Sequence, residues 1–216
     1  MIPPVAGRRL DRFTGHIAGL GTTSGTRLVV GCWEHSPLGS FADVMIQRGD
    51  GHRVLLAPRP DVAAYVRETY TFDEVRVVPV AVERDPDAAS WSVRTPELDL
   101  AFDVGGRHLV SWPLRAVPPG LRDSRAWARL CDPVARRLMP GVRTFGSAGR
   151  GREEWYAARE VRRIVAVEAT WEGAPLGTLA PVDPPVGFGF GSAPATPTLT
   201  RIRTTVRVPT PTPEAA

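Results

Sequence analysis

Lysine and asparagine are absent from this chain of 216 residues, and glutamine occurs once, at Gln47. All 27 residues in the combined count of lysine and arginine are therefore arginine. Because a lysine amine is the group that condenses with a carbonyl to form an imine, its absence excludes lysine-dependent aldolase, decarboxylase and pyridoxal mechanisms. Amino acids with A-rich codons are missing as a set, which indicates a GC-rich genome more than selection at any one position.

Cysteines and long apolar runs are also scarce. The two cysteines, Cys32 and Cys131, are far apart and form no CxxC pair. No apolar run approaches the roughly 20 residues that a membrane span needs, and Met1 leads straight into Arg8 and Arg9 without a secretory leader. These features predict a soluble cytoplasmic protein with free thiols and no membrane partner.

Metal-ligand patterns and basic runs are missing as well. The four histidines show no metal-ligand spacing, so we expect neither a metal nor a cofactor. The net charge of +4 is modest, and no run of adjacent basic residues is interleaved with aromatics. A nucleic-acid partner is therefore not expected.

The 22 prolines and 21 glycines are spread between short β-like runs, which indicates many turns. Residues 41–82 show the pattern best. A strand at 43–47 leads into the turn Gly49-Asp50-Gly51, and a second strand at 53–56 runs back. Pro60 and Asp61 favour the start of a short helix, and the β-branched run 75–82 predicts a buried strand.

Other segments have equally simple patterns. Alternating or β-branched runs predict further strands at residues 16–20, 26–33, 90–94, 98–103, 108–114, 161–170, 175–179 and 198–208. Single helical turns are expected at 8–13 and around Trp155. Residues 124–139 predict a second helix, because Trp127, Leu130 and Val134 recur at helical spacing. We expect this apolar stripe to pack against a sheet or to close one barrel end; the alternative is a partner-binding face.

Nine to eleven strands and two short helices predict a mainly β (α+β) fold, either an antiparallel β-barrel or a strongly curved sheet. Residues 1–208 are expected to form a single β-rich domain. Residues 209–216 are expected to be a disordered tail of proline and threonine.

Two short motifs resemble the acetoacetate decarboxylase-like superfamily, including its YqjF-type members. In that family an aromatic-x-acidic strand precedes a helix ending in Arg-Glu-x-aromatic-x-aromatic-Pro-Lys. Phe41-Ala42-Asp43 is similar to the first motif and Arg67-Glu68-Thr69-Tyr70-Thr71-Phe72 to the second. This chain has Asp73-Glu74 where the decarboxylases have Pro-Lys, so their Schiff-base lysine is missing. The resemblance implies a related barrel with a cavity and with Glu74 in the place of the lysine.

Under this resemblance Asp43 and Glu74 are the candidate catalytic residues, and Tyr70 and Arg76 lie nearby as ligand-binding residues. A carboxyl group in an apolar cavity has a raised pKa and acts as a general acid or base near neutral pH. The alternative is that Glu74 pairs with Arg76 on a solvent-facing edge while Asp43 caps the hairpin entrance.

Two further segments provide candidate ligand contacts. Arg150 and Arg152 lie in a glycine-rich loop, where they are suited to bind an anion; an ordinary flexible loop is the alternative. Phe188 and Phe190 alternate with glycines, which is typical of a bent strand at a barrel corner or beneath a ligand.

Two functions follow from the sequence. The first is a lyase, isomerase or hydratase without a Schiff base, acting on a small organic acid through Asp43 or Glu74, with an arginine on the substrate carboxylate. The second is a non-catalytic barrel that binds a small apolar or acidic ligand. The sequence alone leaves homo-oligomerisation open.

Overall fold

The computed structural model describes residues 8–87, 89–149, 151–189 and 193–209. The strands are β1 (Arg8–Thr22), β2 (Arg27–His35), β3 (Phe41–Gln47), β4 (Arg53–Ala57), β5 (Glu74–Val77), β6 (Ala81–Asp85), β7 (Ser90–Arg94), β8 (Leu98–Arg107), β9 (Phe145–Ser147), β10 (Glu153–Trp171), β11 (Ala174–Pro175), β12 (Leu179–Ala180) and β13 (Thr198–Pro209). The helices are α1 (Pro60–Thr69), α2 (Ser111–Ala116), α3 (Pro119–Arg122) and α4 (Arg125–Leu138).

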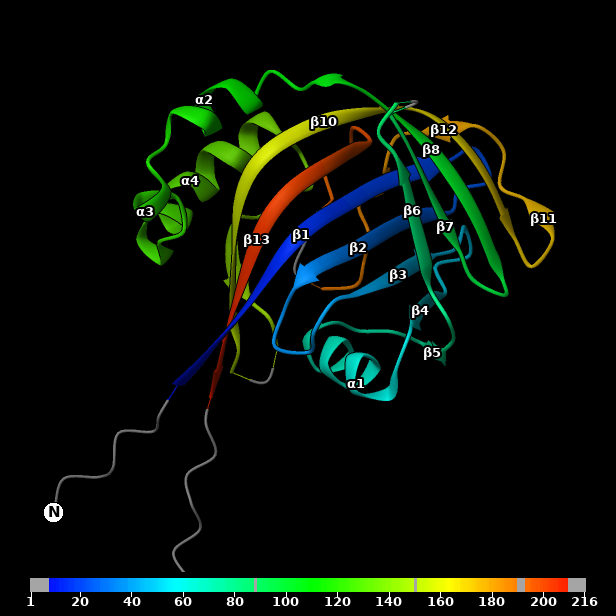
Figure 1. Cartoon of the computed structure of the whole chain (residues 1–216), viewed down its shortest axis with the longest axis horizontal. Helices are drawn as coiled ribbons and strands as arrows, with labels where there is room; N and C mark the ends of the chain where they lie inside the picture. The colour runs from blue at the N-terminus through cyan, green and yellow to red at the C-terminus, as the bar shows by residue number, and fades with distance from the viewer. Residues whose placement is uncertain (1–7, 88, 150, 190–192, 210–216) are drawn as a thin grey trace, which may run out of the picture.

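The main strands form one sheet in the order β5-β4-β3-β2-β1-β13-β10-β8-β7-β6. Figure 1 shows this sheet curling strongly, with the long strands β1, β13 and β10 along its bend. The mainly β fold with a strongly curved sheet is therefore confirmed. Four helices are present in the described chain, where the sequence predicted two.

Neighbouring strands are antiparallel except β4 and β5, which are parallel. A parallel pair needs a crossover connection, and α1 provides it. Pro60 stands in the first turn of α1, followed by Asp61, as expected of residues that favour a helix start. This crossover places α1 against one face of β1 to β4.

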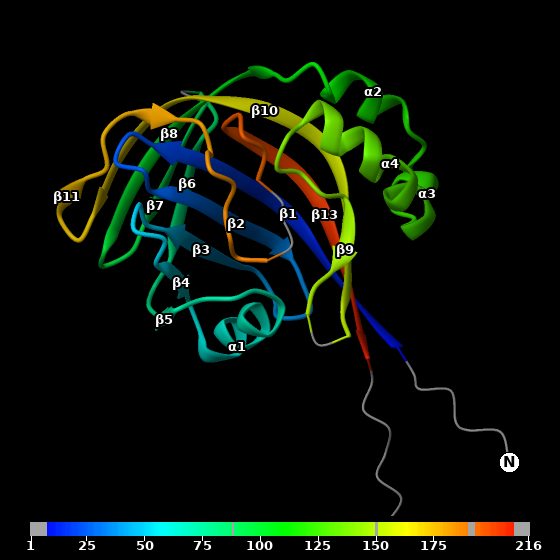
Figure 2. The same cartoon turned by 180° about the vertical axis from the view of Figure 1, so that it is seen from behind.

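Alternate residues of β1 and β2 face opposite sides of the sheet, as the period of a strand requires. Ala18 and Val30 belong to a core cluster shared with β7 and β8. Their chain neighbours Ile17 and Val29 instead belong to a cluster shared with Phe188 and other residues beyond β12. The sheet therefore has apolar packing on both faces, and the candidate site lies on the second one, beside α1 (Figure 2).

Three local predictions are wrong. Residues 8–13 are not helical: they belong to β1 and pair with β13, from Arg8 opposite Pro209 onward. The turn expected around Trp155 is part of β10, which pairs with β13 on one side. Pairing between distant strands overrides weak local preference in both places. The strand expected at 108–114 is also wrong, because α2 begins at Ser111 and has Pro113 in its first turn, where a missing N–H costs little.

The expected strand at 75–82 is divided. β5 ends at Val77 and β6 begins at Ala81, with Pro79 between them. Proline has no N–H to donate to a strand partner, so the run is interrupted there. The consequence is that residues 74–77 pair at one end of the sheet order and residues 81–85 at the other.

Helices α2, α3 and α4 lie together beside β10, at one end of the molecule (Figures 1 and 2). The predicted helix at 124–139 is present as α4. Its expected packing is wrong, since the side chains of Leu130 and Val134 are 69% and 58% exposed. Within the described part of the chain, no helix combines the length and the apolar character needed to cross a bilayer.

Candidate active site

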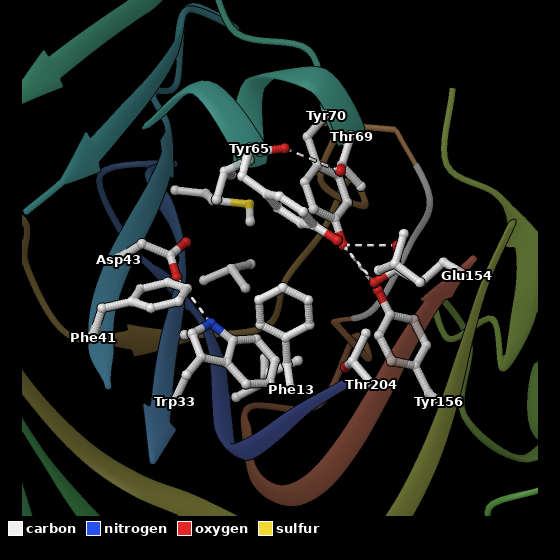
Figure 3. Close-up of a pocket in the computed structure, with 16 residues that line it drawn as sticks. Phe13, Trp33, Phe41, Asp43, Tyr65, Thr69, Tyr70, Glu154, Tyr156 and Thr204 are labelled. Carbon is white, nitrogen blue, oxygen red and sulfur yellow. Dashed lines mark hydrogen bonds between the residues drawn. The ribbon is translucent and has the colours of Figure 1, made fainter. Parts of the chain in front are cut away.

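A cavity lies between α1 and the face of the sheet made by β1, β2, β3, β13 and the first part of β10. The cavity has a volume of about 50 Å³, which is room for a few waters or a small organic molecule. Its walls are mostly aromatic and aliphatic (Figure 3), and the lining residues are Phe13, Ile17, Val29, Gly31, Trp33, Phe41, Asp43, Met45, Tyr65, Val66, Thr69, Tyr70, Glu154, Tyr156, Thr204 and Val206.

Asp43 is the first of two carboxyl groups in this cavity. It projects from β3 and is 1% exposed. Its Oδ1 accepts a hydrogen bond of 3.1 Å from the indole nitrogen of Trp33, and its Oδ2 has no hydrogen-bond partner in the described part of the structure. Burial raises the pKa of Asp43 to about 7, and the Trp33 hydrogen bond opposes this rise. Asp43 is therefore suited to exchange a proton near neutral pH.

Gly31 makes room for this arrangement. It lies directly opposite Asp43 in the pairing of β2 with β3. A Cβ at position 31 would be 2.5 Å from Asp43 Oδ1 and 2.7 Å from the Trp33 indole nitrogen. Any larger residue must therefore displace the hydrogen bond between Trp33 and Asp43.

Replacing Gly31 by alanine tests that constraint. We expect Gly31→Ala to lower the free energy of unfolding by about 1–3 kcal/mol, because the added methyl group overpacks the cavity wall. Urea unfolding followed by tryptophan fluorescence measures the loss. Gly120→Ala is the control, since a Cβ at Gly120 meets nothing within 4 Å. Equal stability of the two variants would contradict the close packing of Gly31 against Asp43 and Trp33.

Glu154 is the second carboxyl group, and it projects from β10 at 2% exposure. The Tyr70 hydroxyl lies 3.1 Å from both carboxylate oxygens of Glu154 and 2.9 Å from the Tyr156 hydroxyl. Burial raises the pKa of Glu154 to about 7, while hydrogen bonds from Tyr156 and Tyr70 act in the opposite direction. The cavity therefore contains two carboxyl groups that titrate near neutral pH.

Both tyrosines of this network remain protonated at neutral pH. Burial raises the pKa of each phenol well above its ordinary value, and the negative charge of Glu154 adds to the effect. Tyr70 and Tyr156 are thus hydrogen-bond donors beside the cavity.

Sequence reasoning missed Glu154 and Tyr156. The two residues are two positions apart on β10, so they face the same side of the sheet. They lie opposite Val206 and Thr204 of β13 in the strand pairing, and these two residues also line the cavity. The sequence feature that could have identified them is their spacing of two, which places both side chains on one face of a strand. The prediction of a helical turn at Trp155 concealed it.

Asp43 and Tyr70 line the cavity, but Glu74 does not. The Glu74 side chain is 38% exposed at the start of β5. It accepts a hydrogen bond of 2.6 Å from Arg76 and lies 3.3 Å from His52. The pKa of Glu74 is lowered, chiefly by the Arg76 hydrogen bond. The expectation that Glu74 and Asp43 share one cavity is therefore wrong, because β5 is the end strand of the sheet and Glu74 pairs there with Arg76.

Two of the predicted arginine contacts, Arg76 and Arg152, are not among the residues that line the cavity. Arg76 binds Glu172 at 2.8 Å and lies over the Trp171 ring. Arg152 is buried behind α1, where it donates a 3.0 Å hydrogen bond to Thr69 Oγ1 and pairs with Glu68. Its guanidinium group lies over the Tyr65 ring, 4.9 Å from the centroid. Arg150 is outside the described residues.

Phe188 is buried at 3% exposure, with its ring centroid 5.6 Å from that of Phe72. It packs in the cluster next to the cavity and is not one of the lining residues. Phe190 lies outside the described residues. Among the residues that the structure describes, no three His, Cys, Asp or Glu side chains come together in a group able to hold a metal ion.

Comparisons with known proteins leave the family open. No family model matches the chain, and no curated protein matches it. A similar solved structure is the crystal structure of acetoacetate decarboxylase from Legionella pneumophila subsp. pneumophila str. Philadelphia 1. The two structures are similar with a TM-score of 0.40 and 9% sequence identity, and the match covers 95% of this chain and 86% of that chain. A likeness of this degree carries no argument about chemistry.

Proposed function

We propose that the cavity is the active site of a general acid–base enzyme, of the lyase, isomerase or hydratase type, that acts on a small uncharged organic molecule. The observation that supports this most is the presence of Asp43 and Glu154 in one cavity, each with a pKa raised to about 7. A carboxyl group with a pKa near 7 is partly protonated at neutral pH, so it can either accept or donate a proton with a similar change in free energy. Reactions that move a proton next to a carbonyl or a double bond need both abilities.

The surroundings of each acid suggest its role. Asp43 Oδ2 has no hydrogen-bond partner among the described residues, so it has free lone pairs to accept a proton as general base. Glu154 accepts a hydrogen bond from the Tyr70 hydroxyl. It is suited to act as the general acid, which donates a proton to the substrate. Each phenol has a single hydrogen to donate, so Tyr70 or Tyr156 can donate to an oxygen that gains negative charge during the reaction only when Glu154 is protonated and releases that hydrogen.

The ligand class follows from size and charge. About 50 Å³ of free space is far below the several hundred Å³ that drug-sized or nucleotide ligands occupy. No arginine or histidine lines the cavity in the described structure, so a carboxylate would find no cation there. A neutral carbonyl compound, alcohol or alkene therefore fits better than the small organic acid expected from the sequence.

A second candidate is a binding pocket without catalysis. It is favoured by the aromatic wall: the ring centroid of Phe13 lies 5.6 Å from that of Trp33 and 5.2 Å from that of Tyr65. Such a wall gains much of its binding free energy from apolar burial. In this case Asp43 and Glu154 would determine the affinity for the ligand, and no reaction would be catalysed.

Proton exchange distinguishes the two candidates. A panel of small ketones, aldehydes and enones is incubated with the protein in D₂O, and proton NMR follows deuterium uptake next to the carbonyl. Wild type is expected to accelerate uptake for at least one compound, and Asp43→Asn to slow it by about 10²–10⁴-fold. Glu74→Gln is the matched control and should retain full activity, because Glu74 lies on the outer surface.

The two acids also predict the pH dependence of that activity. The rate should pass through a maximum near pH 7, and Glu154→Gln should remove one limb of the profile. Equal losses in Asp43→Asn and Glu74→Gln would contradict the proposal. Compounds that raise the melting temperature but undergo no exchange would support the binding pocket instead.

A further inference from the structure

The helix α4 has its apolar stripe turned outward. Leu130, Val134 and Leu138 are four residues apart, so they form one stripe along the helix. Their exposures are 69%, 58% and 64%. In an ordinary surface helix such residues face the core and polar residues face water. The orientation of α4 is the reverse.

Polar contacts fix this orientation. Asp132 is 9% exposed on the inward side of α4, and its Oδ1 accepts hydrogen bonds from the backbone nitrogens of Thr144 at 2.7 Å and Phe145 at 3.3 Å. Thr144 Oγ1 donates to the backbone oxygen of Ala128 at 2.7 Å. The Ser124 hydroxyl caps the first turn by accepting from the Trp127 nitrogen. Breaking the buried contacts of Asp132 would be costly, so the apolar stripe stays outward.

Residues 109–139 contain most of the exposed large apolar side chains. Nine such side chains are found in the described structure, and six of them fall here: Leu109, Trp112, Leu121, Leu130, Val134 and Leu138. These six belong to α2, α3, α4 and the residue positions just before them, which lie together beside β10 (Figures 1 and 2). We call residues 109–139 the helical segment. A concentration of this kind marks an interaction site.

The helical segment also carries the net charge of the whole chain. It contains six arginines, at 115, 122, 125, 129, 136 and 137, and two aspartates, at 123 and 132, which gives +4. The remaining residues contain 21 arginines and 21 acidic residues, which gives zero. Arg129, Arg136 and Arg137 are all exposed. Arg137 lies beside the apolar stripe, whereas Arg136 lies 3.7 Å from Asp132 and Arg129 lies over the Phe145 ring. The partner must therefore be both apolar and anionic.

We propose that the helical segment binds in the plane of an anionic lipid bilayer. The stripe Leu130, Val134 and Leu138, together with Trp112, enters the boundary between headgroups and acyl chains, while the arginines contact lipid phosphates. A second copy of the chain fits less well, since a symmetric contact would oppose +4 to +4. Such peripheral binding needs no spanning helix, and it replaces the sequence-based expectation of no membrane partner.

Vesicle sedimentation tests the proposal on the full chain. The protein is expected to sediment with vesicles of phosphatidylcholine and phosphatidylglycerol but not with phosphatidylcholine alone, and to dissociate at high salt. The triple variant L130S/V134S/L138S should lose at least tenfold in binding. R137Q should lose roughly fivefold, since one arginine near an anionic surface contributes about that factor; Arg136 is left in place because it pairs with Asp132.

Matched controls and competing outcomes complete the test. V77S/V165S removes two other exposed apolar side chains, 49% and 54% exposed outside the helical segment, and should bind like wild type. Thermal unfolding checks that every variant folds. Equal binding of wild type and L130S/V134S/L138S would overturn the proposal. The proposal would also be overturned if light scattering showed a dimer in the absence of lipid and this triple variant were monomeric. A second copy of the chain would then cover the stripe.

Discussion

Asp43→Asn is expected to stabilise the folded protein, and by more as the pH rises. In the unfolded chain the carboxyl group of Asp43 loses its proton near its ordinary pKa of 3.8, whereas in the folded protein its pKa is about 7. Between these values the folded state binds more protons than the unfolded state, so stability falls as the pH rises and levels off above pH 7. A shift of this size corresponds to about 4 kcal/mol, which asparagine does not lose because it does not ionise.

Urea unfolding at about pH 5 and about pH 8.5 measures this effect. The stability gain of Asp43→Asn over wild type should grow by about 3 kcal/mol between the two pH values. Glu154 is present in both proteins, so its own titration cancels to first order. Glu74→Gln is the control, because Glu74 is exposed and its pKa is lowered, and its difference from wild type should not grow. A gain that is the same at both pH values would show that Asp43 is not buried in its charged form.

Gly15→Ala is expected to destabilise the protein by at least about 3 kcal/mol. A Cβ at Gly15 would lie 2.0 Å from the backbone oxygen of Cys32 and 2.9 Å from Cα of Trp33. Both atoms belong to the backbone of β2, so no side-chain rotation relieves the clash and the two strands must separate. The pairing of β1 with β2 already shifts register between Thr14 and Gly15, which indicates that this close approach is part of the bend in β1.

The same substitution should also disturb the cavity. Phe13 and Ile17 lie on either side of Gly15 in β1, and both line the cavity with Trp33. Thermal and urea unfolding measure the loss of stability, and tryptophan fluorescence reports on Trp33. Gly106→Ala is the control in another strand, since its added Cβ would meet nothing closer than 4.0 Å. A loss in Gly15→Ala no larger than in this control would contradict the close packing of β1 on β2.

The alternation of apolar residues predicted much of the sheet. Residues 98–103 alternate in polarity and residues 198–208 alternate over most of their length, and both runs are strands in the structure. The curvature was anticipated from the number of short strands and turns. The helical segment was only partly predictable: apolar spacing indicated α4, but nothing local shows that its stripe faces solvent, because this depends on Asp132 meeting Thr144 in the fold.

The candidate site was half predictable. Asp43 was identified from a short motif, and the structure places it in the cavity. Glu74 was assigned by its position after that motif, yet it belongs to the end strand β5 and pairs with Arg76. Glu154 comes from a strand more than a hundred residues away from Asp43 in the sequence. Long-range strand pairing brings these two acids together, and single-sequence patterns do not report which strands will be neighbours.

The position of β13 has a consequence for how the molecule forms. This strand lies between β1 and β10, and its residues Thr204 and Val206 close one wall of the cavity. Contacts between segments so far apart in the chain make folding slow, because a large loop must be ordered before they form. During synthesis the hairpins of β1 to β4 can assemble first, and the free edge of β1 stays open to chaperones or to other chains until β13 leaves the ribosome.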